Sequence, residues 1–248
     1  MARHFASWRP TLIPKSAKIS ATIGTCLLIA AALAALLIAF FFSSPLYRHY
    51  YEAHDLSADT GMSTDSGVEA YEVLLDYLSG QRDDITVYEA VNGYTQEVYL
   101  PSEELHMADV KVLFQRSTAV FFAFLLAGVV LLGSAFVRTA HGYRTSMVLS
   151  GFHRGALIDG CILIAIILFA LVDFDAFWYR IHTVLFPNNT YWLMDPNISI
   201  MINLFPEGYW FQVIVLSLVV WFLLQIAAEL ILRRLLVHNA ARSRPRGN

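Results

Sequence analysis

Four long apolar stretches dominate the sequence, and they are separated by segments that carry nearly all of its charge. A helix rises about 1.5 Å per residue, so about 20 apolar residues cross the roughly 30 Å hydrocarbon core of a bilayer. The pattern therefore predicts a membrane α-helical protein with four transmembrane helices. These helices are expected over residues 19–42, 116–138, 156–172 and 209–232.

The third stretch is the shortest of the four, and it contains a carboxylate. Asp159 lies one turn from the start of this stretch. A charged carboxylate in the middle of a bilayer costs several kcal/mol. We therefore expect Asp159 to lie at the level of the lipid headgroups.

The composition agrees with a bilayer as part of the solvent. Hydrophobic residues make up 57% of the 248 residues and charged residues 15%, which is far from the balance of an ordinary soluble domain. Both cysteines, Cys26 and Cys161, lie inside apolar stretches, so a disulfide framework or a thiolate metal site is not expected. The sequence also has no basic patch of the kind that binds nucleic acid.

The distribution of charge predicts the orientation of the helices. Lys and Arg gather at 1–18, 139–155 and 233–248, with Arg138 beside the second of these segments, whereas 43–115 and 173–208 hold eighteen of the 20 acidic residues. Cytoplasmic segments of membrane proteins are enriched in Lys and Arg. We therefore expect both termini and residues 139–155 in the cytoplasm, and the two acidic segments outside it.

The segment 43–115 is too long for a simple connection and carries structural signals of its own. Ser66 followed by Glu69 matches a capping box, and the apolar spacing after it is helical and stops at Gly80. We predict a helix over about 67–79.

A hairpin and a second helix are predicted in the rest of this segment. Residues 85–100 are rich in Val, Tyr and Ile around Asn92 and Gly93, a pair typical of a two-residue hairpin turn. A further helix is expected to begin near Glu103 and to continue into the second transmembrane helix. The segment should thus form a small α+β extracytoplasmic cap.

The second outer segment, 173–208, is rich in aromatic residues. Aromatic rings favour the boundary between lipid and water, so this segment is expected at the membrane interface. Its rings are Phe174, Phe177, Trp178, Tyr179, Phe186, Tyr191, Trp192 and Phe205.

Two outer histidines are the candidates for chemistry. His106 and Asp109 lie three residues apart on the predicted helix and share a face, so the carboxylate can orient the imidazole. His182 lies among apolar residues. The simpler interpretations are a solvated helix pair and an interfacial anchor. No HExxH or other close ligand spacing favours a metal site.

Two long segments resemble a bacterial family of four-span membrane proteins that includes the lipoprotein intramolecular transacylases. One is the run LHMADVK at 105–111, which is followed by the second apolar stretch. The other is the aromatic run at 174–209, and the helix expected at 71–78 is also similar. The resemblance covers the chain from the first to the fourth apolar stretch.

The resemblance implies an enzyme in the bacterial cell membrane whose active site faces outside. Its substrates would be diacylglyceryl-modified lipoproteins held among membrane lipids. The enzyme would move the sn-2 acyl chain to the α-amino group of the N-terminal cysteine and leave a lyso-form lipoprotein. The catalytic histidines of the family correspond to His106 and His182, and the resemblance implies that the reaction uses neither a metal nor a cofactor.

Specific roles can be expected for these residues. We expect His106, held by Asp109, to act as the base, and His182 to act as a donor toward the ester. If both act on one ester, their rings must lie within about 12 Å. Should His182 be only an anchor, the second donor would come from Arg180, Tyr191 or Asn203.

Two other functions remain open at this stage. The chain can be a non-catalytic membrane protein whose cap binds lipid or peptide, in which case both histidines would be dispensable. It can also be a lipid hydrolase or an intermolecular acyltransferase that uses the same histidines. Released fatty acid or a different acceptor would then be found.

Overall fold

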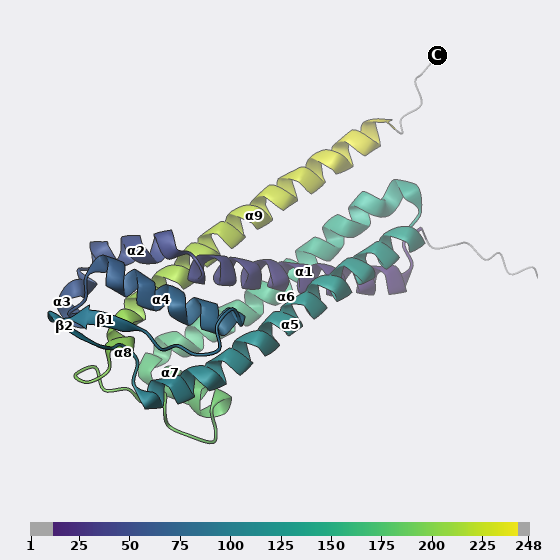
Figure 1. The fold of residues 1–248 in the computed structure, drawn as a ribbon. Helices are drawn as coiled ribbons and strands as arrows, with labels where there is room; N and C mark the ends of the chain where they lie inside the picture. Colours follow the sequence, from purple (N-terminus) through teal and green to yellow (C-terminus); the bar gives the residue numbers. More distant parts are fainter. Residues whose placement is uncertain (1–11, 243–248) are drawn as a thin grey trace, which may run out of the picture. The chain divides into compact units, whose positions relative to one another are not determined.

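The computed structural model describes residues 12–242, and the ends of the expected cytoplasmic segments, 1–11 and 243–248, lie outside that range. The described chain is mostly helical, with four helices long and apolar enough to cross a membrane. The predicted membrane α-helical architecture is thereby confirmed. The long helices are α1 (Lys15–Phe41), α5 (Pro101–Arg138), α6 (Arg144–Val172) and α9 (Glu207–Arg242) (Figure 1).

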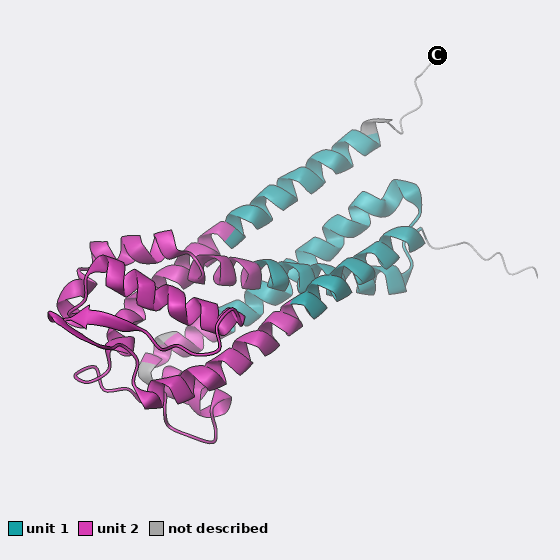
Figure 2. Ribbon diagram, viewed as in Figure 1, with its two compact units in different colours: residues 1–32, 122–165, 221–248 teal, residues 33–121, 166–220 magenta. Residues whose placement is uncertain are grey.

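The chain forms two compact units, and each long helix contributes to both (Figure 2). Unit 1 takes residues 1–32, 122–165 and 221–248, as far as these are described. Unit 2 takes residues 33–121 and 166–220 and contains the shorter helices and both strands.

Unit 1 is held together by close backbone approach between its helices. A Cβ on Gly24 of α1 would lie 2.9 Å from the carbonyl oxygen of Gly128 on α5. A Cβ on Gly151 of α6 would lie 3.0 Å from the backbone of Ala21. Small residues allow such contact between membrane helices, where packing replaces the hydrophobic effect.

The helix that contains the third apolar stretch is longer than the stretch itself, and the depth of Asp159 in the membrane stays a prediction. The helix α6 begins at Arg144, inside the expected loop 139–155, so Asp159 lies near its middle and not one turn from its start. The charges at Arg144 and Arg154 do not stop the helix, because Arg has a high helix propensity. Asp159 accepts a hydrogen bond from Cys26 Sγ on α1 at 3.1 Å.

The hairpin predicted in the cap is confirmed. The strands β1 (Tyr88–Val91) and β2 (Tyr94–Glu97) pair antiparallel, shorter than the expected span 85–100. Asn92 and Gly93 have φ angles of 51° and 85°, as a two-residue turn with left-handed backbone requires.

The cap contains more helices before the hairpin than the sequence predicted. The helices α2 (Ser44–Ala53) and α3 (Leu56–Thr60) precede the expected one, which runs as α4 (Thr64–Ser79). The N-cap of α4 is Ser63, whose Oγ accepts from the Ser66 amide at 3.1 Å. The capping box assigned to Ser66 was therefore wrong by three residues, because Ser63 offers the same capping oxygen one turn earlier.

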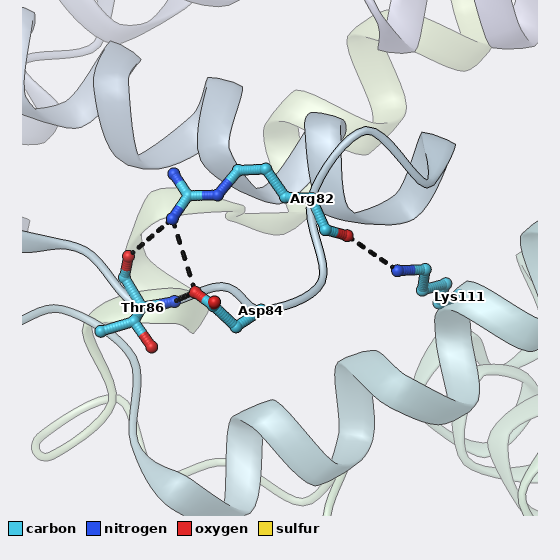
Figure 3. Close-up of polar contacts among 4 residues, drawn as sticks. All are labelled: Arg82, Asp84, Thr86 and Lys111. Carbon is cyan, nitrogen blue, oxygen red and sulfur yellow. Dashed lines mark hydrogen bonds and ion pairs between the residues drawn. The ribbon is translucent and has the colours of Figure 1, made fainter.

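Polar contacts attach the loop after α4 to α5 (Figure 3). Lys111 Nζ donates to the carbonyl oxygen of Arg82 at 3.0 Å and lies 3.9 Å from the centre of the Tyr77 ring. Arg82 Nη2 donates to the Thr86 carbonyl at 3.2 Å and lies 3.4 Å from Asp84 Oδ1. These contacts connect the segment before the hairpin to α5, the helix that carries His106.

A buried group of tyrosines forms the centre of unit 2. Tyr47 stacks on Tyr71 with ring centres 4.0 Å apart, and Tyr47 Oη donates to the Leu204 carbonyl at 3.0 Å. Burial raises the pKa of both phenols well above the ordinary range. The group connects the cap to the second outer segment, which contains α7 (Phe174–Leu185) and α8 (Ile200–Leu204).

Candidate active site

His106 lies in the polar first part of α5, before the apolar run that is expected to cross the membrane. Glu103, the third residue of the helix, accepts from the Leu100 amide at 2.8 Å and so closes the helix start in the manner of a capping box. The next turn carries His106 into the protein, where it is only 6% exposed. Its Nδ1 is buried and has no hydrogen-bond partner among residues 12–242.

Burial sets the protonation state of His106. The pKa of His106 is lowered to about 4, first because burial penalises the charged ring and second because His182 lies nearby. Asp109 acts in the opposite direction but does not outweigh these effects. His106 is therefore a neutral imidazole at neutral pH.

His182 lies on α7, whose first turn is capped by Asp173 through a hydrogen bond from the Ala176 amide at 2.9 Å. His182 Nδ1 is 2.9 Å from the carbonyl oxygen of Trp178, one turn earlier. A carbonyl oxygen only accepts, so Nδ1 carries the proton and Nε2 is the open, basic nitrogen of the neutral ring. The ring lies 4.4 Å from Trp178 and 5.0 Å from Trp192, centre to centre.

The two histidines, 76 residues apart in the sequence, lie close together in unit 2. Their ring centres are 6.4 Å apart, with an angle of 35° between the ring planes. Phe186 packs against both, at 4.9 Å from His106 and 5.9 Å from His182. The predicted approach within about 12 Å is confirmed.

Asp109 has a different partner from the one predicted. Its Oδ2 accepts from Asn189 Nδ2 at 2.8 Å, and within the described chain His106 forms no hydrogen bond with it. Three residues along a helix place the two side chains on one face, but the buried His106 ring turns toward His182 and Phe186. Asp109 instead connects α5 to the loop after α7.

The three alternative donors have no recorded contact with the histidine pair in the described structure. The Arg180 guanidinium is 6.0 Å from the centre of the Phe169 ring, and Asn203 Nδ2 donates to the Pro196 carbonyl at 2.9 Å. Tyr191 is 41% exposed. In the described structure, none of the three has a hydrogen bond or ring contact with His106 or His182.

Two contacts of the site were not foreseen. Ser199, the N-cap of α8, accepts from the Ile202 amide at 3.2 Å and donates to Glu103 Oε1 through a short hydrogen bond. Burial raises the pKa of Glu103. The second is the contact of Trp192 with His182, whose ring centres lie 5.0 Å apart. Trp192 Nε1 is buried without a hydrogen-bond partner in the described range. No sequence pattern indicates that Glu103 and Ser199 pair, because 96 residues separate them.

The site offers two neighbouring imidazoles in different environments and an aromatic surround. In residues 12–242, no three His, Cys, Asp or Glu side chains gather closely enough to hold a metal ion. One neutral buried ring and one ring with an oriented, open Nε2 suit proton transfer coupled to stabilisation of a developing oxyanion.

Comparison with known proteins identifies the family. The sequence pattern of the family described as "Lipoprotein intramolecular transacylase Lit" matches residues 21–210, which is most of the chain. The chain belongs to this Lit family. It is thus a multi-pass membrane transacylase that acts on lipoproteins. Membership of this family argues against the alternative of a non-catalytic membrane protein.

Solved structures agree on the fold of the Lit family. The chain is similar to the membrane-integral Lit from Bacillus cereus at 19% identity, with a TM-score of 0.68 over 92% of this chain and 98% of that one. A variant of the Bacillus cereus protein with a histidine replaced by arginine gives a TM-score of 0.69 at 19% identity, over 92% and 95%. No curated protein sequence matches the chain.

Proposed function

We propose that the chain moves the sn-2 acyl chain of a diacylglyceryl lipoprotein to the α-amino group of its N-terminal cysteine, with His106 and His182 as the catalytic residues. The observation that carries the proposal is the 6.4 Å separation of two imidazole rings in unequal environments. An ester with its attacking amine and leaving oxygen needs two such groups within one small volume.

His182 is the better base. Its Nδ1 is committed to the Trp178 carbonyl, so Nε2 is fixed as the nitrogen that can take a proton. As the amine nitrogen forms its bond to the ester carbonyl carbon, Nε2 accepts the proton that this nitrogen releases. The carbon–oxygen bond to glycerol then breaks, and His182 returns the proton to the glycerol oxygen.

His106 is the better hydrogen-bond donor. A ring whose pKa is lowered to about 4 holds an extra proton poorly, but its neutral N–H can stabilise the oxyanion that forms from the carbonyl oxygen. These roles are exchanged relative to the expectation from sequence, because burial affects His106 and the helix carbonyl orients His182. The burial of a particular ring is not visible in a sequence pattern.

The surrounding residues position the substrate. Asp109 acts through Asn189, which connects the loop after α7 to α5. Arg180, Tyr191 and Asn203 remain candidates for contact with the polar part of the lipoprotein, and the rings of 173–208 for contact with acyl chains and membrane lipids. Nucleophile and ester belong to one molecule, so positioning supplies much of the rate and the reaction needs no cofactor.

The proposed function can be tested in cells. Bacteria that carry diacylglyceryl lipoproteins with free α-amino groups should yield lyso-form N-termini when this chain is expressed. Mass spectrometry of N-terminal lipopeptides would measure the product. Cells that express the chain with His182→Ala provide the control, and lyso-form product in those cells at the wild-type level would contradict the proposed base.

We also propose that the chain lies in the cytoplasmic membrane with both termini inside and the histidine pair outside. The expected result of labelling intact cells with an impermeant maleimide is reaction at Asp83→Cys and protection at Gly142→Cys, both in a variant without Cys26 and Cys161. The two positions are exposed in the structure, so a difference between them reports sidedness. Reaction at the second position alone would reverse the orientation.

A further inference from the structure

A cavity of about 220 Å³ lies in unit 1, between the start of α1 and the start of α6. Its polar lining consists of Lys18 from α1 and of Ser146, Ser150 and Arg154 from α6. Among the described residues, no Asp or Glu lines it. The cavity is therefore a site of positive charge with hydroxyl groups beside it.

Both cations of the cavity lack a partner in the described part of the chain. The side chains of Lys18 and Arg154 form no hydrogen bond or ion pair with any residue from 12 to 242, nor do the hydroxyls of Ser146 and Ser150. Some other cations of unit 1 are engaged, as Arg233 is with Glu229 and Arg138 with Ser20. The cavity thus gathers donors that have no acceptor in the described chain.

The α6 residues form one continuous stripe. Ser146, Ser150 and Arg154 follow one another at intervals of four, which places them on one face of the helix. Gly151 lets α1 approach this face, since a Cβ there would lie 3.0 Å from Ala21. Close contact of the two backbones holds the wall of the cavity in place.

The cavity lies where charge gives way to apolar sequence. Lys18 is the last charged residue before the apolar stretch of α1, and Arg154 precedes the apolar part of α6. The next residues along the helices include Ile19 and Leu157, which are 61% and 67% exposed. Such a boundary is the level of lipid headgroups, with exposed apolar side chains beside it for acyl chains.

From these observations we infer that the cavity binds the phosphate of an anionic phospholipid headgroup. A phosphate oxygen accepts hydrogen bonds from ammonium, guanidinium and hydroxyl groups, and basic pockets between membrane helices select anionic lipids. Free phosphate shares this chemistry, but the exposed apolar residues beside the cavity favour the lipid. The site is distinct from the histidine pair, and the inference does not depend on the proposed acyl transfer.

Binding of phosphatidylglycerol to the purified full chain in neutral detergent, measured by native mass spectrometry, tests the inference. The double variant Lys18→Gln/Arg154→Gln should bind phosphatidylglycerol about tenfold to thirtyfold more weakly than the wild type. Ser150→Leu, which narrows the cavity and keeps both charges, should also weaken binding. Inorganic phosphate at the same concentration should not displace the lipid.

The matched control is Lys15→Gln/Arg234→Gln, which removes the same charge from positions that are exposed, as Lys18 and Arg154 are, but that do not line the cavity. It should change binding less than twofold. Equal weakening in both double variants would show a general effect of charge, and unchanged binding in the cavity variants would overturn the site. Displacement by inorganic phosphate would mean that the cavity binds a free anion and not a lipid, which would overturn the inference. If the double variant does not fold, binding of phosphatidylglycerol by Ser150→Leu is compared with that of the wild type.

Discussion

Replacing His182 or His106 with alanine is expected to lower the rate of transacylation by about 10²-fold to 10⁴-fold, because the first loss removes the base that moves the proton and the second removes the donor that stabilises the oxyanion. The rings lie 6.4 Å apart and serve one transition state. Residues that act as a unit are not additive, so the double variant should lose about as much as either single one. Purified variants with a diacylglyceryl lipopeptide would provide the rates.

An exposed histidine provides the control for these variants. His141→Ala removes an imidazole from the exposed turn before α6 and should keep the wild-type rate. Melting temperatures in detergent would establish that each variant is folded. Multiplicative losses in the double variant would argue that the two rings act in separate steps, and full activity of folded His182→Ala would return that residue to an interfacial anchor.

The acid stability of the protein should depend on His106. Its pKa is lowered to about 4 in the folded chain, against about 6.5 in an unfolded one. The unfolded state therefore binds more protons between these values, and stability is lost as pH falls from about 6.5 toward 4. The loss attributable to this ring is about 2–3 kcal/mol at pH 4.5 and close to zero at pH 7.5.

Comparison of His106→Phe with the wild type isolates this effect. Both proteins contain the same carboxylates, so the drop in melting temperature between pH 7.5 and pH 4.5 should be smaller in His106→Phe by an amount that corresponds to the lost proton linkage. His141→Phe, at an exposed position, should keep the wild-type drop. An equal drop in all three proteins would mean that the His106 ring is solvated and that its role as a neutral donor is wrong.

Local signals in the sequence were enough for the helix that carries His106 and for the hairpin before it, but not for α7, the helix that carries His182. Asn92 and Gly93 predicted the hairpin because few residue pairs accept left-handed backbone at both positions. The glutamates after Pro101 predicted a helix start, and the apolar run that follows predicted its continuation into the membrane. The shared motif, together with the placement of both histidines outside the membrane, suggested the pair.

Contacts between distant segments were out of reach of such signals. Asn189 bonds Asp109 across 80 residues, and Ser199 bonds Glu103 across 96. No periodicity indicates which side chain of a loop meets a given helix. The true start of α6 was also missed, because a Lys and Arg bias predicts which side of the membrane a segment faces but does not predict where a helix begins.

Unequal environments for two like residues are the physical basis of the proposed chemistry. A single imidazole in water cannot be both a fixed acceptor and a neutral donor. Burial makes His106 neutral, and the Trp178 carbonyl fixes the tautomer of His182. The chain thereby obtains complementary roles from one residue type, as other enzymes do when neighbouring groups have separated pKa values.

The most direct test follows the acyl chain itself. A synthetic diacylglyceryl lipopeptide with an isotope label only in its sn-2 acyl chain would be incubated with the purified protein and analysed by tandem mass spectrometry. The account predicts a product of unchanged total mass in which the label is attached to the α-amino nitrogen. Loss of the labelled chain as free fatty acid, or gain of an unlabelled chain from phospholipid, would contradict intramolecular transfer.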